Sequence, residues 1–248
     1  MPIKAVLFDM FDTLMMIEKN HAFYSPAVKS MHSSLVKNGI TVSFAAFREA
    51  YIKARDAIYE QADEKMEEPH FNLRVKNALQ SLDHNCALDS EVVTGATNAF
   101  CHEFMNYVRI DEHAEEVLRQ LHGKYKLGVV SNFAIPECVQ KLLDQNGLAK
   151  LLDIIIVSAA VNKRKPSPEI FKHALQRLKV TATETVFVGD TVEADIKGAQ
   201  DVGMKTVYID RRPQKELEQT CPNQTIKSLG ELPGVLDKLI AQHESRYL

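Results

Sequence analysis

The chain has 248 residues, 45% of them hydrophobic, enough for one Rossmann-sized domain with an insert or for two small domains. Its 30 basic and 33 acidic side chains give a net charge of −3, which disfavours nucleic acid and anionic membranes as partners. No apolar run approaches the ~20 residues that span a bilayer, and the first residues lead into a strand rather than a signal peptide. We therefore expect a cytoplasmic protein. Its four cysteines are scattered, which supports neither a zinc site nor a disulfide framework.

The first predicted element is a strand over residues 3–8, a nearly continuous apolar run typical of a parallel strand buried on both faces. From about residue 15 to 108 the spacing becomes helical, and no comparably apolar strand interrupts it. Apolar residues three or four apart illustrate this spacing: Phe44, Phe47, Tyr51, Ala54 and Ile58. This region is predicted to be a helical insert, with helices near residues 22–38, 44–65, 71–82 and 89–107.

After the insert, short apolar strands and helices alternate. Strands are predicted at residues 126–131, 153–157, 185–188 and 205–209, and helices at 112–122, 135–146, 167–179 and 192–202. Repeated βα units indicate an α/β fold with a doubly wound parallel sheet. The predicted core domain is therefore discontinuous, residues 1–15 joined with 108–248, and the insert covers residues 16–107. Residues 211–223 are predicted to form a polar surface loop, followed by a terminal helix.

Polar residues stand where three of these strands end. Asp9 follows the first strand, Ser131 and Asn132 end the second, and Asp190 follows the strand at 185–188. In open α/β sheets ligands bind outside the carboxyl ends of the strands, so these side chains can converge on one crevice. Ser131 and Asn132 suit the anchoring of phosphoryl or carboxylate oxygens, although a turn or helix cap would use the same residue types.

Four segments in this order resemble the motifs of the haloacid dehalogenase (HAD) superfamily. They are Asp9-Met10-Phe11-Asp12-Thr13, then Ser131-Asn132, then Lys165-Pro166-Ser167-Pro168, and finally Gly189-Asp190 with Asp195 beyond it. The resemblance covers nearly the whole chain and implies a Rossmann-like core with a helical cap inserted after the first motif.

The resemblance also implies roles for these residues. Asp9 would be a nucleophile that forms an aspartyl ester, and Thr13 would orient it or bind the transferring group. Lys165 would screen the anionic nucleophile from an anionic substrate, with Lys163 as a weaker candidate. Mg²⁺ would be bound by Asp9, the backbone carbonyl of Phe11, Asp190, and Asp195 directly or through water.

Phe11 departs from the pattern of the superfamily's phosphatases, which usually read Asp-x-Asp-Gly-Thr. The second Asp serves as general acid and base, a contribution of typically 10²–10⁴-fold, and phenylalanine can do neither. If the strand geometry persisted, Asp12 would face away from the leaving group, because alternate residues point to opposite faces. Asp12 and, more speculatively, His21 in the insert remain alternative proton donors.

Three functions fit these residues. The favoured one is a Mg²⁺-dependent phosphatase of a small phosphorylated metabolite, supported by Gly189-Asp190 and Asp195. The second is a metal-independent 2-haloacid dehalogenase, which Phe11 supports but the Gly-Asp motif opposes. The third is a weakened or non-enzymatic member that binds a phosphometabolite or a protein partner. The substrate itself and the oligomeric state are left open.

Overall fold

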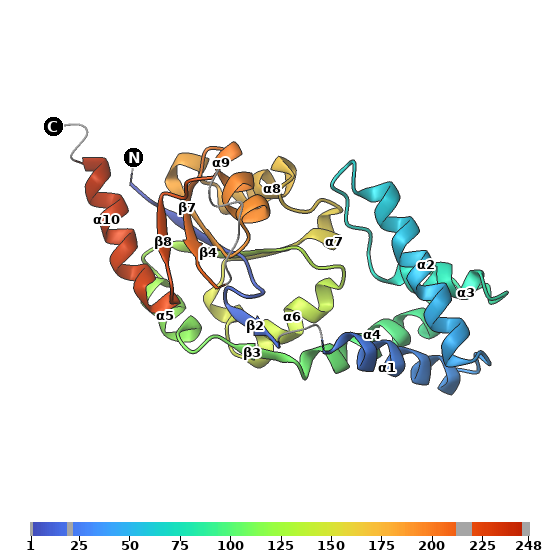
Figure 1. Ribbon diagram of the computed structural model, residues 1–248. Coiled ribbons are helices and arrows are strands. Elements are labelled where there is room, and N and C mark those ends of the chain that lie inside the picture. The colour runs from blue at the N-terminus through green and yellow to red at the C-terminus, as the bar shows by residue number, and fades with distance from the viewer. Residues whose placement is uncertain (1, 19–21, 212–219, 245–248) are drawn as a thin grey trace.

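The computed structural model describes residues 2–18, 22–211 and 220–244, the last of these without side chains beyond residue 240. Its centre is a six-stranded parallel sheet in the order β5-β4-β1-β6-β7-β8 (Figure 1). The strands are β1 (Ala5–Phe8), β4 (Lys126–Ser131), β5 (Ile154–Val157), β6 (Thr185–Gly189), β7 (Lys205–Ile209) and β8 (Gln224–Ile226). The predicted α/β fold with a parallel sheet is therefore confirmed.

The central strand shows why both faces of the sheet must be covered. All four residues of β1 are buried. Ala5 and Leu7 pack with side chains of α8 (Pro168–Leu178) and α9 (Gly198–Asp201). Val6 and Phe8 pack on the other face, in the core that includes α5 (Ala114–Leu121), α6 (Pro136–Gln145) and α10 (Leu232–Glu244). Successive residues of a strand point to opposite faces, so the apolar run satisfies both layers of helices.

The strand order places the end of β1 at the point where the chain connections reverse the direction in which they cross the sheet. β1 pairs with β4 on one side and with β6 on the other. Chain connections run outward from this central strand in both directions, which opens a crevice beyond its carboxyl end. Asp9 is the first residue after the strand and therefore lies at this switch point.

The insert contains α1 (Tyr24–Lys37), α2 (Phe44–Ala62), α3 (Asn72–Gln80) and α4 (Glu91–Met105), which group on one side of the α/β core (Figure 1). The four predicted helices are thus present. The chain enters and leaves the insert through two antiparallel strands, β2 (Met15–Ile17) and β3 (Val108–Ile110). The sequence prediction missed this ribbon and the edge strand β8. None of the described helices is long and apolar enough to cross a membrane.

Candidate active site

The four motifs meet in one cavity at the carboxyl end of the sheet. This carboxylate cavity has a volume of about 230 Å³. It is lined by Asp9, Phe11, Asp12, Asn132, Lys165, Asp190, Thr191, Ala194 and Asp195. Asp9 and Asp190 follow β1 and β6, Asn132 follows β4, and Lys165 lies in the loop before α8. Strand ends that are far apart in sequence thus bring together most of the predicted site residues.

Lys165 lies between two carboxylates. Its Nζ atom is 2.6 Å from Asp9 Oδ1 and 2.6 Å from Asp195 Oδ1, and all three side chains are buried or nearly so. Burial disfavours the charged ammonium, but the negative charges of Asp195 and Asp9 outweigh it and raise the pKa of Lys165. The lysine therefore stays protonated beside the predicted nucleophile.

Lys163, the weaker candidate for this role, lies elsewhere. Its ammonium donates to the carbonyl of Lys65 at 3.1 Å and is 3.9 Å from Glu67 and 3.7 Å from Glu169. These partners belong to the loop after α2 and to α8, outside the carboxylate cavity. The geometry thus places Lys165 rather than Lys163 beside Asp9.

Three carboxylates surround this single lysine. Oxygen atoms of Asp9, Asp190 and Asp195 lie within 4.8 Å of one another, and all three residues are buried. Burial, reinforced by the charge of Asp195, raises the pKa of Asp9 to about 7 against the opposing effect of Lys165. Burial and the charges of Asp9 and Asp195 raise the pKa of Asp190 to about 8. The surplus of negative charge and the all-oxygen donors fit a hard divalent cation.

Asp195 is held in place rather than exposed on a helix surface. It belongs to a π-helical segment, Val192–Lys197, where its Oδ2 accepts a hydrogen bond from the Thr191 N–H at 3.0 Å. A Cβ atom on Gly189 would lie 2.4 Å from Asp195 Oδ2. Glycine is therefore required before Asp190 because any side chain would displace this carboxylate.

Asn132 holds the lysine loop. Its Nδ2 donates to the Lys165 carbonyl at 2.9 Å, and its Oδ1 accepts from the Lys165 N–H at 2.8 Å. The Ser131 and Thr13 hydroxyls are buried and have no hydrogen-bond partner among the described residues. Neither residue is among those lining the carboxylate cavity. The sequence predicts that Ser131 and Asn132 bind substrate oxygens. Asn132 in addition positions the loop that carries Lys165, a role that the sequence does not indicate.

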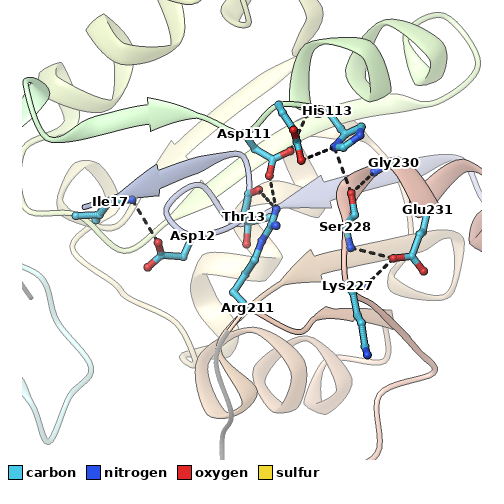
Figure 2. A network of polar contacts seen from close by, with 11 residues as sticks. Asp12, Thr13, Ile17, Asp111, His113, Arg211, Lys227, Ser228, Gly230 and Glu231 are labelled. Carbon is cyan, nitrogen blue, oxygen red and sulfur yellow. Dashed lines mark hydrogen bonds and ion pairs between the residues drawn. The ribbon is translucent and has the colours of Figure 1, made fainter. Parts of the chain in front are cut away.

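The prediction for Asp12 assumed that the first strand continues through the motif, but the strand ends before Asp12. β1 ends at Phe8, and Asp12 has a φ of +59°, in the left-handed region that glycine prefers and aspartate tolerates. The Asp12 carboxylate accepts a hydrogen bond from the Ile17 N–H at 3.3 Å (Figure 2), and Asp12 is one of the residues that line the carboxylate cavity. The prediction that Asp12 faces away from the leaving group assumed that the strand persists to this residue, and that condition is not met. His21 lies outside the described residues.

Phe11 joins the core to the helical insert. Its ring centroid lies 5.6 Å from that of Phe104 on α4 and 5.0 Å from that of Phe133 after β4. The position that holds a carboxylate in related phosphatases thus belongs to an aromatic cluster here. No acid or base occupies the Phe11 position itself.

A largely buried ion pair contacts the loop after β1 (Figure 2). The Arg211 guanidinium, just after β7, donates to the Asp111 carboxylate next to β3 and to the Thr13 carbonyl at 3.5 Å. Asp111 also accepts a hydrogen bond from the His113 N–H at 2.9 Å. The sequence analysis assigned Arg211 to a polar surface loop and missed this contact. The position of Arg211 after a predicted strand does not indicate that Asp111 is its partner.

Comparisons with known proteins identify the family. A family model described as haloacid dehalogenase-like hydrolase matches residues 3–203. The chain belongs to this family. A glyceraldehyde 3-phosphate phosphatase of Methanocaldococcus jannaschii is 29% identical over 242 residues, 96% of this chain and 98% of the relative. The pyrimidine 5'-nucleotidase YjjG of Escherichia coli is 30% identical over 126 residues, 50% of this chain and 56% of the relative.

Solved structures confirm the fold of this HAD-like hydrolase. A 2-haloacid dehalogenase from Pseudomonas syringae pv. Tomato DC3000 superimposes with a TM-score of 0.71 at 23% identity, covering 96% of this chain and 99% of the other. A HAD phosphatase from Thermococcus onnurineus gives 0.64 at 24% identity, covering 94% and 98%. Both a dehalogenase and a phosphatase thus share the arrangement, so the reaction must be argued from the site.

Proposed function

We propose that this HAD-like hydrolase is a Mg²⁺-dependent phosphatase of a small phosphorylated metabolite. The observation that carries the proposal is the buried group of Asp9, Asp190 and Asp195, three carboxylates with one lysine among them. A divalent cation would balance the remaining negative charge, whereas without a metal the raised pKa values of Asp9 and Asp190 would lead these carboxylates to take up protons instead. Relatives similar over most of the chain that are phosphatases support the same reaction class.

The proposed reaction runs through Asp9. Its carboxylate oxygen attacks the phosphorus atom, the bond from phosphorus to the leaving alcohol breaks, and an aspartyl phosphate forms. Water then attacks the phosphorus of this intermediate, which releases inorganic phosphate and restores the carboxylate. Lys165 reduces the repulsion between Asp9 and the anionic substrate, since its ammonium is 2.6 Å from the nucleophile.

The remaining polar groups would hold the phosphoryl group and the metal. Asp9, the Phe11 carbonyl and Asp190 would bind Mg²⁺, with Asp195 contributing directly or through water. When bound, the ion neutralises charge on the phosphoryl oxygens. The Ser131 hydroxyl, which is buried and has no hydrogen-bond partner among the described residues, would donate to a phosphoryl oxygen, and Asn132 would hold the loop that carries Lys165. Thr13 would orient the nucleophile.

Phe11 shapes the proposed substrate range. An alcohol with a high pKa needs a proton as it departs, and Phe11 cannot supply one. Asp12 lines the same cavity, and its carboxyl is the proposed alternative, although it also accepts the Ile17 N–H. We therefore expect substrates with good leaving groups to react fastest. We further propose that residues 16–107 form a cap over the site. The enzyme would be cytoplasmic and would act on free metabolites.

A metal-independent 2-haloacid dehalogenase is the second candidate, favoured by the aromatic residue at position 11. A non-enzymatic binding protein would also explain the loss of the acid. Parallel assays of phosphate release and halide release, with and without Mg²⁺, separate the three. Phosphate released only with Mg²⁺ is expected. Halide released without Mg²⁺ would instead select the dehalogenase, and neither product would favour a binding protein.

A further inference from the structure

A second cavity, of about 190 Å³, lies between the helical insert and the core. It shares Asn132 with the carboxylate cavity and is therefore its neighbour. Most of its wall is aromatic, with Tyr24, Tyr51, Tyr59, Phe71, Phe100 and Phe133 among the lining residues. We call it the aromatic cavity. Its size suits part of a substrate, such as a single substituted ring, rather than a whole drug-sized ligand.

A buried ion pair, Arg74 with Glu68, lies in this wall. The Arg74 guanidinium donates to the Tyr59 hydroxyl at 2.6 Å and to Glu68 Oε1 at 3.2 Å. It also lies over two rings, 4.7 Å from the centroid of Tyr59 and 5.2 Å from that of Phe71. Filling this space with apolar side chains would cost less desolvation free energy than burying an ion pair there. The arginine and its partner therefore point to a binding role rather than to packing alone.

Two polar atoms at this cavity are unpartnered. The Tyr51 hydroxyl and the Arg74 Nε–H are buried and have no hydrogen bond of good geometry among the described residues, although the Arg74 guanidinium and the Tyr24 hydroxyl lie near enough to the Tyr51 hydroxyl to influence its pKa. Tyr51 is fully buried, and its burial raises the pKa of the phenol, which therefore remains protonated as a donor. Leaving a buried donor without a partner costs roughly 1–3 kcal/mol, so such groups call for an explanation. A ligand with hydrogen-bond acceptors supplies one.

We propose that the aromatic cavity binds the leaving-group part of the substrate, and that this part is a flat ring carrying carbonyl or ring-nitrogen acceptors, like a pyrimidine base. This inference rests on the proposed phosphatase function. Flat rings stack against aromatic walls, and ring acceptors satisfy the donors of Tyr51 and Arg74. A short polyhydroxylated chain would instead bury its hydroxyl groups against hydrocarbon, with few partners.

Phe11 connects the two cavities. Its ring packs against Phe133, which lines the aromatic cavity, while Phe11 itself lines the carboxylate cavity. The residue that replaces the usual acid thus continues the aromatic wall toward the reacting phosphate. A substrate that spans both cavities would place its phosphate beside Asp9 and its ring beyond Phe11.

Three phosphate esters test this inference: uridine 5'-monophosphate, which has a ring with acceptors; benzyl phosphate, which has a ring without them; and glyceraldehyde 3-phosphate, which has no ring. We expect kcat/KM to fall in that order. Tyr51→Phe removes only the hydroxyl, so it should raise KM for the uridine ester about 3- to 10-fold, the worth of one hydrogen bond. It should leave kcat and the benzyl phosphate kinetics unchanged, and it should not lower the thermal midpoint, because it removes a buried donor that has no partner in the free protein. Tyr125→Phe, at a half-buried tyrosine that does not line the cavity, is the matched control.

Calorimetric titration of the three esters into the Asp9→Asn protein separates this inference from the proposed function. If no ester is hydrolysed by the wild type but the uridine ester binds tightest and Tyr51→Phe weakens it, the phosphatase proposal fails and the ring-binding cavity stands. If glyceraldehyde 3-phosphate is preferred, or if Tyr51→Phe changes all three esters equally or none, the cavity does not bind a ring and the inference is overturned.

Discussion

The carboxylate cavity and the aromatic cavity adjoin at Asn132 and differ in origin and chemistry. The first is built by loops at the ends of strands of one sheet and concentrates charge, with Lys165 2.6 Å from two carboxylates. The second is built largely by the helical insert and concentrates rings around one buried ion pair. Under the roles proposed above, the first cavity carries out the reaction and the second selects the substrate. Changes in the first should affect every substrate, and changes in the second should affect only their ranking.

Asp9→Asn gives the largest expected effect on the chemistry. The carboxamide has nearly the same shape but is a poor nucleophile and metal ligand, so turnover should fall on the order of 10⁴-fold or more for every substrate. The fold should be retained, because Lys165 keeps its contact with Asp195. The measurement is kcat for several esters together with the thermal midpoint. Substantial turnover by a folded Asp9→Asn protein would remove Asp9 from the role of nucleophile.

Asp190→Asn should lower activity and Mg²⁺ affinity together. Changes to residues that only support a metal ligand cost about 10–100-fold, and loss of a direct ligand should exceed this. Activity titrated with Mg²⁺ for wild type and variant measures both quantities. An unchanged Mg²⁺ dependence would exclude Asp190 as a ligand. Asp201→Asn, on α9 and exposed, is a control expected to have no effect.

Lys165→Met tests the charge balance of the carboxylate cavity. Without the ammonium, the buried carboxylates of Asp9 and Asp195 lose their shared partner, and the free energy of unfolding should fall by about 3 kcal/mol. Added Mg²⁺ should restore part of this loss. Denaturant unfolding with and without Mg²⁺ is the measurement. Lys163→Met, whose ion pairs are long and partly exposed, should change stability by less than about 1 kcal/mol. Equal effects of the two variants would contradict the assignment.

Phe11→Asp lies at the border of the two cavities and should have the smallest effect. A carboxyl at this position should raise kcat/KM for alkyl phosphates relative to aryl phosphates, by about 10-fold, well below the ~10²–10⁴-fold limit of general acid catalysis. The gain is limited because Asp12 occupies a left-handed position where related phosphatases have glycine. The ratio of the two rates, in a variant shown to be folded, measures the effect. An unchanged ratio would mean that the proton comes from elsewhere or that phosphate ester hydrolysis is not the reaction.

Asp12→Asn complements this test and identifies the alternative donor. If the Asp12 carboxyl delivers the proton, the variant should lose alkyl phosphate activity and keep aryl phosphate activity. Asparagine also tolerates a positive φ and can still accept the Ile17 N–H, so the loop should keep its shape. Equal losses on both substrate types would indicate a structural role for Asp12 instead.

Much of the core could be predicted because its signals are local. The strands at 126–131 and 205–209 are apolar runs whose observed bounds match the predicted ones. The meeting of Asp9, Lys165 and Asp190 in one cavity could be predicted from the order of the motifs and from the sheet topology. Short strands were missed for a physical reason. β8 has three residues, Gln224–Ile226, at the sheet edge, and only Ile226 is buried. Its pairing depends on β7 and leaves no apolar run in the sequence.

The insert shows the limit of sequence reasoning. Helical spacing predicted that Phe47 and Tyr51 share a buried face, and both are fully buried. The spacing could not show that Tyr51 lines a cavity or that Arg74 lies over the rings of Tyr59 and Phe71, because these contacts join separate elements. The domain boundaries at residues 15–16 and 107–108 stay a prediction, although β2 and β3 lie beside them.

Acid quenching of a single turnover tests the central claim most directly. The protein is mixed with a slight deficit of an aryl phosphate labelled in its phosphoryl group, quenched within the first turnover, digested and analysed by mass spectrometry. Labelled phosphate should be found on the peptide that contains Asp9, only when Mg²⁺ is present, and not in the Asp9→Asn protein. Label on another residue, or release of phosphate without any labelled peptide at the earliest times, would contradict an aspartyl phosphate at Asp9.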